Sequence, residues 1–319
     1  MGNIIIFGSE GFTGKYLVET LVKKSYNCIN VDLIDQVSNN YYQCDIRNKD
    51  EFSNIPISSD DIVVHLAAVQ YHSNVPSRNN RKKYFLETNF EGTNNILEWM
   101  LNANCRKMIY FSSDMVYGKP QELPVNEYHL RNPFGNYGFS KKSTENQCLE
   151  FINKYNFNIT IFRPRLIMGP GRLGILKKLF KLIKFNMPVP LIGNGNNCYQ
   201  MISVYDCVQA IVKTIEHNVP NSIMNLGSSN PPSVKELLNQ LINSVNSKSF
   251  TIPMPAWPIK KILDVMDKSG LSLMYPEQYM IADENYLLDI TKAKDDINWI
   301  PEYSDQDMLF QAYNHFIKE

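Results

Sequence analysis

The stretch Asn3-Ile-Ile-Ile-Phe-Gly-Ser-Glu-Gly-Phe-Thr-Gly14 decides the fold class of this 319-residue chain. Residues 3–7 are an apolar run without alternation, which is typical of a strand buried on both faces in a parallel sheet. The glycines that follow allow a tight turn and let backbone N–H groups approach a pyrophosphate, and an amphipathic helix over residues 15–24 comes next. The stretch therefore predicts the strand, turn and helix that begin a dinucleotide-binding unit.

A second buried strand is expected over residues 28–31, and it leads into Asp32, 18 residues past Gly14. A carboxylate at this place can accept hydrogen bonds from both hydroxyls of the adenosine ribose, and it would repel a 2′-phosphate. Asp32 therefore predicts NAD rather than NADP as the cofactor. Asp35, three residues later, is expected to be a loop residue.

Two later strands end in residues that suit a ligand site. Residues 61–65 lead into Leu66-Ala-Ala68, whose small alanines leave room for a ligand at the carboxyl end of a strand. Residues 108–111 lead into Ser112-Ser113, and a hydroxyl there can hydrogen-bond a substrate oxygen. His65 is expected to be a packed strand residue and not a catalyst.

Tyr137 and Lys141 lie four residues apart at the start of an expected helix. Residues i and i+4 share one face of a helix, so the Lys141 ammonium can lie beside the Tyr137 ring. A nearby cation favours the phenolate and lowers a pKa that is ~10 in water, which lets the phenol exchange a proton near neutral pH. An exposed helix pair would look the same in isolation, but the glycine turn and the serine-rich strand end favour an acid/base role.

Composition excludes several classes of protein. Lys+Arg and Asp+Glu both number 32, so the net charge gives no case for binding nucleic acid or an anionic membrane. The six cysteines have no paired spacing, which indicates reduced thiols in a cytoplasmic protein. No apolar run is long enough to span a membrane, and the five histidines have no metal-ligand spacing.

The remaining helices and strands are expected as follows. Residues 81–100 predict one long helix, and residues 173–185 predict a basic amphipathic helix whose lysines form either a solvated face or an anion-binding one. Residues 253–269 are expected to form a lid or a substrate wall. Strands are predicted at 159–162, 201–204, 224–226 and 286–289, and helices at 206–217, 234–245 and within 290–317.

Taken together, the motifs resemble the extended short-chain dehydrogenase/reductases, the NAD-dependent epimerase/dehydratase group, over nearly the whole chain. The matching motifs are Gly8-x-x-Gly11-x-x-Gly14, Asp32, Asp45-Ile46, His65-Leu-Ala-Ala68, Asn89, Ser112-Ser113-x-x-Val-Tyr117-Gly118, Tyr137-x-x-x-Lys141 and Arg163-Pro-x-x-x-x-Gly-Pro170. The resemblance implies an α/β fold, with a Rossmann doubly wound parallel sheet and a smaller, discontinuous C-terminal substrate domain. It implies an NAD-binding domain over residues 1–165, joined by parts of about 198–226, and a mostly substrate-binding domain over 166–319.

The resemblance also implies roles for individual residues. Tyr137 is the expected general acid/base, Lys141 lowers its pKa and holds the nicotinamide ribose, Ser113 holds the reacting oxygen, and Asp114 is a further candidate acid. NAD contacts are expected from Gly8, Gly11, Phe12, Thr13, Gly14, Asp32, Asp45, Ile46, Leu66, Ala67, Ala68, Asn89, Tyr137, Lys141 and Pro164. Substrate contacts are expected from Gln70, Met115, Arg165, Arg172 and Tyr199.

Departures from the family pattern leave the substrate open. Similar sugar-nucleotide 4,6-dehydratases carry Asp-Glu after the catalytic Ser/Thr, whereas this chain has Asp114-Met115, which disfavours 4,6-dehydration. UDP-sugar epimerases usually have Asn where Leu166 stands and Arg where Tyr199 stands, so two diphosphate contacts are missing. Arg165, Arg172 and the lysines that follow could replace them.

Three functions therefore remain in view. The first is an NAD-dependent oxidoreductase or epimerase acting on a nucleotide-linked sugar, for cell-surface polysaccharide. The second is oxidation of a hydrophobic alcohol, because residues 163–170 and 192–197 resemble the 3β-hydroxysteroid dehydrogenase branch. The third is a non-catalytic NAD-binding module. A homodimer formed through the helices at residues 81–100 and 141–155 is implied by the family resemblance.

Overall fold

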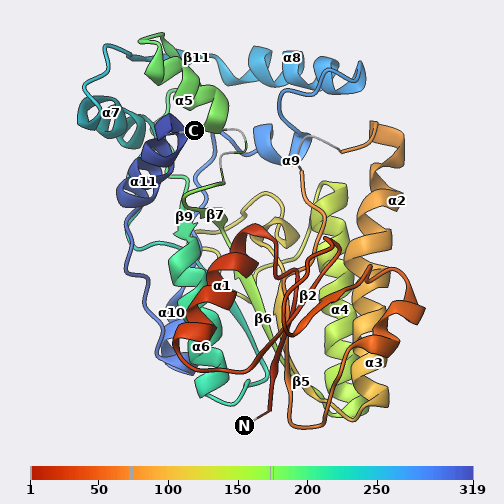
Figure 1. Cartoon of the computed structure of the whole chain (residues 1–319). Coiled ribbons are helices and arrows are strands. Elements are labelled where there is room, and N and C mark those ends of the chain that lie inside the picture. Colours follow the sequence, from red (N-terminus) through yellow and green to blue (C-terminus); the bar gives the residue numbers. More distant parts are fainter. Residues whose placement is uncertain (1, 72–74, 173, 175, 319) are drawn as a thin grey trace.

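A seven-stranded parallel sheet forms the centre of the molecule (Figure 1). The structure is a computed structural model that describes residues 2–71, 75–172, 174 and 176–318. The strand order is β10-β6-β5-β4-β1-β2-β3, which confirms the predicted α/β class and Rossmann sheet. The strands are β1 (Ile4–Phe7), β2 (Cys28–Asp32), β3 (Tyr41–Gln43), β4 (Ile62–His65), β5 (Lys107–Phe111), β6 (Asn158–Pro164) and β10 (Ser222–Leu226).

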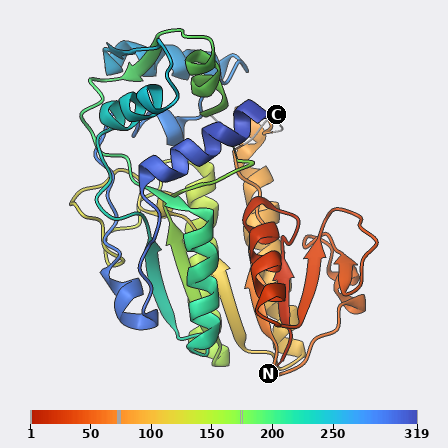
Figure 2. The same cartoon turned by 60° about the vertical axis from the view of Figure 1, so that its left-hand side comes forward.

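Helices cover both faces of this sheet (Figures 1 and 2). One face carries α1 (Phe12–Lys23), α6 (Val204–Glu216) and α10 (Thr291–Ile297), which pack on side chains such as Ile4 and Ile6 of β1. The other face carries α3 (Thr93–Asn102) and α4 (Asn136–Tyr155), which pack on Ile5 and Phe7. All four residues of β1 are buried, as its unbroken apolar run predicts.

The sheet has a switch point between β1 and β4. The chain runs outward from β1 through β2 to β3, and then returns to β4 on the other side, where Phe7 pairs with His65. Ligands of open α/β sheets bind at the carboxyl ends of the strands at such a point. The ends of β1, β4, β5 and β6 accordingly define where the site is to be sought.

The predicted helix over residues 81–100 is continuous but irregular. It consists of α2 (Arg81–Leu86), a π-helical turn (Glu87–Gly92) and α3. Shorter 3-10 turns occur at Lys49–Asn54, Arg78–Asn80 and Asp114–Val116. Among the described residues, no helix combines the length and apolar character needed to cross a bilayer.

The C-terminal part forms a smaller lobe above the strand ends (Figure 1). Its two-stranded sheets pair β7 (Leu166–Met168) with β9 (Met201–Ser203), and β8 (Val189–Ile192) with β11 (Thr251–Met254). Its own core joins apolar residues of α5 (Leu176–Lys184), α7 (Val234–Ser244) and α11 (Asp305–Lys318). The predicted helix at 173–185 is observed from Leu176 onward, because residues 173 and 175 lie outside the described part.

Two C-terminal predictions need comment. The segment expected to be a lid or wall forms β11, α8 (Ala256–Lys268) and, after a turn, α9 (Pro276–Tyr279). The strand predicted at 286–289 is wrong as a regular strand: the segment makes isolated bridges, Tyr286 with Tyr199 and Leu288 with Val125. Residues 286 and 288 bridge to two separate segments of the chain, so residues 286–289 do not form a continuous strand pair with either segment.

Candidate functional site

The turn after β1 has the shape that a pyrophosphate requires. Gly8 has a φ of +85°, and a Cβ on it would lie 2.6 Å from the backbone nitrogen of Ala67 at the end of β4. A Cβ on Gly14 would lie 2.1 Å from the carbonyl oxygen of Gly8. Gly11 is the N-cap of α1 and brings no side chain to cover the helix terminus, and the buried hydroxyl of Ser9 has no partner among the described residues. A phosphate at a helix N-terminus fits these features.

Asp32 lies directly over this turn. Its Oδ2 accepts a hydrogen bond from the backbone N–H of Glu10 at 2.9 Å, and its Oδ1 accepts one from Ile34 at 3.2 Å. The carboxylate is therefore fixed at the end of β2 with lone pairs left for a ribose. This is the place that the sequence assigns to the adenosine ribose.

Replacing Asp32 by alanine is expected to weaken NAD binding and to narrow the preference for NAD over NADP. The variant loses two charge-assisted acceptors, and it also loses the negative charge that repels a 2′-phosphate. Titration of both cofactors by calorimetry measures the effect, with Asp35→Ala as the matched control. Unchanged affinities in the Asp32 variant would mean that the ribose is held elsewhere.

The residues predicted to hold the rest of NAD surround the switch point. The N–H groups of Leu66 and Ala67 both donate to the carbonyl of Phe7 at 2.9 Å, which ties the end of β4 to the end of β1. Asn89, in the π-helical turn, accepts from Val69 N–H at 2.9 Å and donates to Ser140 of α4 at 3.1 Å. A π-helical turn often marks a functional position, and here it fixes Asn89 between the loop and α4.

Other predicted cofactor residues have mainly structural contacts. Asp45 binds the guanidinium of Arg47, whose hydrogen bonds to the carboxylate hold the pKa of that carboxyl below its usual range. Ile46 packs on the π-helical turn, where a Cβ on Gly92 would lie 2.7 Å from its Cδ1. Four more lie at the ends of other elements: Phe12 and buried Thr13 open α1, Ala68 follows β4, and Pro164 pairs with Leu226 at the end of β6.

Ser113 and Tyr137 meet at the carboxyl end of β5. The residues come from different elements, and the Ser113 hydroxyl lies near enough to the phenol to oppose the rise in its pKa. The Ser113 hydroxyl also donates to Oδ1 of Asp114 at 3.0 Å and accepts from Met115 N–H at 3.2 Å. Met115 contributes its backbone to the same corner, since a Cβ on Gly138 would lie 2.4 Å from its carbonyl oxygen.

Lys141 is buried beneath Tyr137, at the end of β5. Its ammonium donates to the carbonyl of Phe111 at 2.7 Å and lies 4.8 Å from the centre of the Tyr110 ring. Burial lowers the pKa of Lys141 to about 7, and burial raises the pKa of Tyr137. Arg172 is the cation that opposes this rise, and the effect of Lys141 on the pKa of Tyr137 stays a prediction.

Asp114 and Arg165 form a buried ion pair behind the serine. The guanidinium lies between the rings of Tyr199 and Tyr286, 4.0 and 3.9 Å from their centres. Its Nε and Nη2 have no hydrogen-bond acceptor among the described residues. Asp114 is therefore engaged by a cation, while two buried donors of Arg165 are left without an acceptor.

Arg172 and Gln70 face the same cleft. Nη2 of Arg172 donates to Oε1 of Gln70 at 2.6 Å, and the guanidinium lies 5.4 Å from the centre of the Phe12 ring. No carboxylate pairs with Arg172 in the described part of the chain. Desolvation lowers the pKa of Arg172, because the neutral amide of Gln70 does not compensate the buried positive charge.

Glu277 is a site residue that the sequence does not reveal. It comes from α9 of the C-terminal lobe, and its Oε1 accepts from the backbone N–H of Tyr137 at 3.0 Å. The N-cap of α4 is Gly135, and a Cβ there would lie 1.6 Å from Oε1 of Glu277. Glu277 therefore supplies the cap that the helix lacks, and burial raises its pKa to about 7.

The sequence also does not reveal an aromatic wall beside Tyr137, which is formed by the rings of Tyr71, Tyr275 and Phe85. The ring of Tyr71 contacts the ring of Tyr137 edge-on, with centres 6.1 Å apart, and stacks on Tyr275 of the C-terminal lobe at 4.3 Å. Phe85 of α2 contacts Tyr137 at 5.7 Å. No local pattern could have found these contacts, because each partner lies in a different segment.

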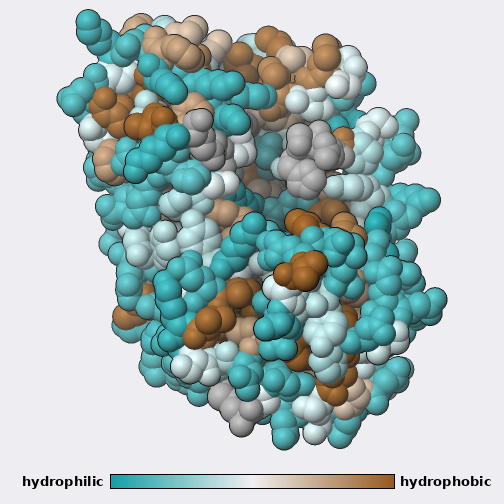
Figure 3. Space-filling model, in the orientation of Figure 1, coloured by the Kyte–Doolittle hydropathy of each residue, from teal (hydrophilic) through white to brown (hydrophobic). Residues whose placement is uncertain are grey.

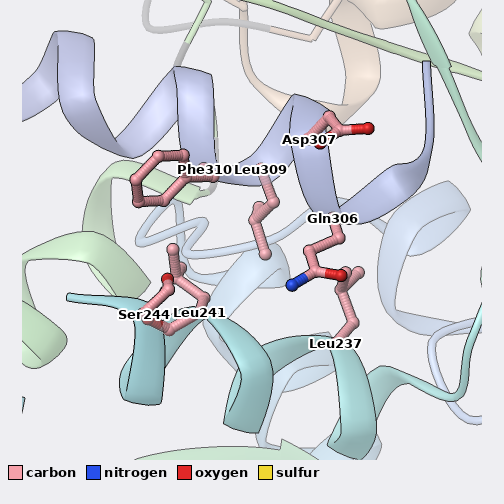
Figure 4. Close-up of a pocket in the computed structure, with 7 residues that line it drawn as sticks. All are labelled: Leu237, Leu241, Ser244, Gln306, Asp307, Leu309 and Phe310. Atoms are coloured by element: carbon pink, nitrogen blue, oxygen red, sulfur yellow. Dashed lines mark hydrogen bonds between the residues drawn. The ribbon is translucent and has the colours of Figure 1, made fainter. Parts of the chain in front are cut away.

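Two hollows lie away from these residues. One, of about 290 Å³, is formed by Leu237, Leu241, Ser244, Gln306, Asp307, Leu309 and Phe310 between α7 and α11 (Figure 4). The other, of about 420 Å³, lies at the far end of α3 beside Phe52 and Trp99. Neither is lined by a predicted site residue. The face in Figure 3 is also hollowed between the lobes, above the strand ends.

The sequence matches a protein-family model over most of its length. Residues 4–227 match the model described as the NAD dependent epimerase/dehydratase family, so the chain belongs to that family. It is an enzyme of this class, and its cofactor is NAD. The glycine turn, the free helix terminus and Asp32 fit that cofactor.

The individual relatives share less than a third of their residues with this chain. The chain is 29% identical to the uncharacterized protein y4nG of Sinorhizobium fredii over 74% of its length, and this match spans 59% of that relative. It is 23% identical to the UDP-glucose 4-epimerase of Vibrio cholerae, covering 99% of this chain and 96% of the relative. It is 27% identical to an N-acetyl-alpha-D-glucosaminyl-diphospho-ditrans,octacis-undecaprenol 4-epimerase of Escherichia coli O157:H7, covering 79% and 83%.

Solved structures agree on the fold. The crystal structure of UDP-glucuronic acid 4-epimerase from Bacillus cereus, in complex with UDP-glucuronic acid and NAD, superimposes with a TM-score of 0.78. The two chains are 21% identical, and the match covers 99% of each. At this identity the likeness concerns the fold alone.

Proposed function

We propose that the protein uses NAD to oxidise a hydroxyl, or reduce a keto group, on a sugar joined to a diphosphate, most simply a nucleotide sugar, and acts as an epimerase or oxidoreductase. The observation that carries the proposal is Arg172. A guanidinium in the cleft, near Tyr137 and bonded to the neutral Gln70, is poised for an anionic ligand. Behind it, two buried nitrogens of Arg165 lack an acceptor among the described residues.

The chemistry follows from the polar groups at the end of β5. NAD, when bound, accepts a hydride from the carbinol carbon and can return one. Ser113 holds the reacting oxygen, and the phenol of Tyr137 takes its proton during oxidation and gives it back during reduction. Glu277 and Lys141 position the helix that carries the phenol, from α9 and from the Phe111 carbonyl respectively.

Elimination of water is not part of the proposal. The residue after Asp114 is Met115, so the glutamate of similar 4,6-dehydratases is missing. Asp114 itself is paired with Arg165 and is not free to act as a base in its place. Both features favour a reaction confined to proton and hydride transfer.

Oxidation of a hydrophobic alcohol is the second candidate, because Tyr71 and Phe85 form an aromatic wall beside Tyr137. The two arginines weigh against it. An apolar ligand would leave the donors of Arg165 unsatisfied and the charge of Arg172 uncompensated. A non-catalytic NAD module has no use for Ser113 and Tyr137 side by side in the cleft, so it ranks third.

Thermal stabilisation of the NAD-loaded protein by a panel of UDP-, GDP-, CDP- and dTDP-sugars tests the proposal. We expect one nucleotide class to raise the melting temperature, since a ligand at 100 times its dissociation constant stabilises by ~2.7 kcal/mol. Arg172→Gln should reduce that shift, whereas the exposed Lys15→Gln should keep it. A panel in which every sugar leaves the melting temperature unchanged sinks the nucleotide-sugar assignment.

A further inference from the structure

One end of the molecule carries apolar side chains that no described residue covers. This end surface is formed by the end of α5, the start of β11 and α8, which lie together at the top of Figure 1. Six apolar residues on it are each more than half exposed: Phe185, Phe250, Trp257, Ile262, Val265 and Leu271. Figure 3 shows hydrophobic residues among hydrophilic ones at the same end.

The two segments that form the end surface are joined by hydrogen bonds. Val189 N–H donates to the carbonyl of Phe250 at 2.9 Å, and Lys248 N–H donates to the side chain of Asn186 at 2.7 Å. Phe185, next to Asn186, therefore belongs to the same surface as Phe250. Phe250 lies 64 residues after Asn186 in the chain. Residues 251–254 then lead directly into α8.

The exposed apolar residues of α8 cannot turn inward. Trp257, Ile262 and Val265 are 72%, 54% and 64% exposed, whereas the opposite side of the helix carries Leu263 and Asp267, both buried. Asp267 makes a buried ion pair with Arg81 of α2 at 2.7 Å. Because breaking a buried pair is strongly unfavourable, this pair fixes which side of α8 faces out.

The end surface is also basic, although the whole chain is neutral. Residues 176–188 and 248–273 together contain eight lysines and only two aspartates, and one of the lysines, Lys260, pairs with Asp283 outside these ranges. One of these aspartates, Asp267, is neutralised by Arg81, and the other, Asp264, by Lys268. The equal totals of the whole chain hide this asymmetry, because the opposite excess lies elsewhere on the molecule.

We propose that the end surface docks onto an anionic lipid bilayer, with Trp257 and its apolar neighbours at the headgroup boundary and the lysines against lipid phosphates. Exposed aromatic and aliphatic side chains mixed with lysines are the chemistry of interfacial binding. A second copy of the chain fits less well, because a two-fold contact would place lysines against lysines. A polyanion without lipid would leave the apolar residues unexplained.

Docking would have a consequence for the substrate, which rests on the proposed function. The turn after α8 leads into α9, whose Glu277 reaches the backbone of Tyr137. A bilayer against α8 therefore lies on the lobe that borders the cleft. A sugar diphosphate carried on a lipid would then be within the enzyme's reach at the membrane surface.

Vesicle flotation of the full NAD-loaded chain tests the docking itself. We expect it to float with vesicles of phosphatidylcholine mixed with phosphatidylglycerol and not with phosphatidylcholine alone, and to be released by salt. Trp257→Ser with Val265→Ser should abolish flotation. The matched control, Val37→Ser with Tyr128→Ser, changes residues that are 104% and 88% exposed elsewhere and should float normally. Each of Lys177→Gln and Lys181→Gln should weaken binding roughly fivefold.

Fluorescence gives an independent readout. The chain has three tryptophans, of which Trp299 is fully buried and Trp99 is partly buried, so a blue shift on adding anionic vesicles reports Trp257. Equal flotation of the Trp257/Val265 and control variants would overturn the proposal. So would light scattering that shows copies associating through this surface without lipid. Neither outcome touches the nucleotide-sugar panel, which measures ligand binding in solution.

Discussion

Replacing Tyr137 by phenylalanine is expected to lower turnover by at least ~10²-fold and to leave NAD affinity unchanged. The phenol lies beside Ser113, and the substitution removes the hydroxyl to which the proposed proton transfer is assigned. Phenylalanine keeps the ring, and with it the contacts to Tyr71 and Phe85. Steady-state turnover of the sugar that stabilises the protein, and calorimetric titration with NAD, measure the two quantities separately.

The control for this variant is Tyr128→Phe. Tyr128 is 88% exposed, so the same chemical change there should affect neither turnover nor NAD affinity. If Tyr137→Phe retained full turnover, the acid/base assignment would be rejected whatever its effect on binding. If it lost NAD affinity as well, the phenol would be a cofactor contact first and a proton donor second.

The residues that sequence could identify are those whose chemistry lies in one short segment. The turn from Gly8 to Gly14 requires glycine for reasons that are local, namely a positive φ and close backbone approach. The spacing of Tyr137 and Lys141 likewise follows from the helix alone. His65 is buried and hydrogen-bonded to Thr93 at 2.8 Å, as a packed strand residue should be.

What sequence could not supply is the partner of each group. Lys141 was expected to act on Tyr137, but its ammonium reaches the carbonyl of Phe111, because β5 ends beneath this turn of α4. The cap of α4 comes from Glu277, 140 residues after Tyr137, and no motif connects them. The π-helical turn at Glu87–Gly92 was predicted as ordinary helix, since apolar spacing does not distinguish the two.

Glu145→Ala is expected to lower the free energy of unfolding by about 3–5 kcal/mol, the range for removing one member of a buried pair. Glu145 lies in α4 with its side chain fully buried, and it accepts from Nε of Arg163 at 2.9 Å and from Nη2 at 2.7 Å. Arg163 lies in β6 with its side chain 1% exposed. Alanine would leave its guanidinium buried without its carboxylate partner.

The pair also has a place in the site, because it joins the helix of Tyr137 and Lys141 to the strand that leads into Arg165. A urea titration of the variant measures the loss of stability, with Glu19→Ala as the matched control. Glu19 makes an exposed ion pair with Lys23 within α1, where both side chains are more than 60% exposed, so its removal should cost less than ~1 kcal/mol.

Glu145→Ala both leaves the charge of Arg163 unpaired and removes the hydrogen bonds that join α4 to β6. A double variant separates these two contributions to the loss of stability. Glu145→Leu with Arg163→Met removes both charges and keeps apolar volume, and such replacements are often neutral or stabilising. The double variant should therefore be more stable than Glu145→Ala if the cost comes from stranding Arg163. Arg131, which also contacts Glu145 at 2.8 Å, is partly exposed and can turn toward water. A double variant as unstable as the alanine variant would show instead that the geometry of the hydrogen bonds, and not the unpaired charge, holds α4 against β6.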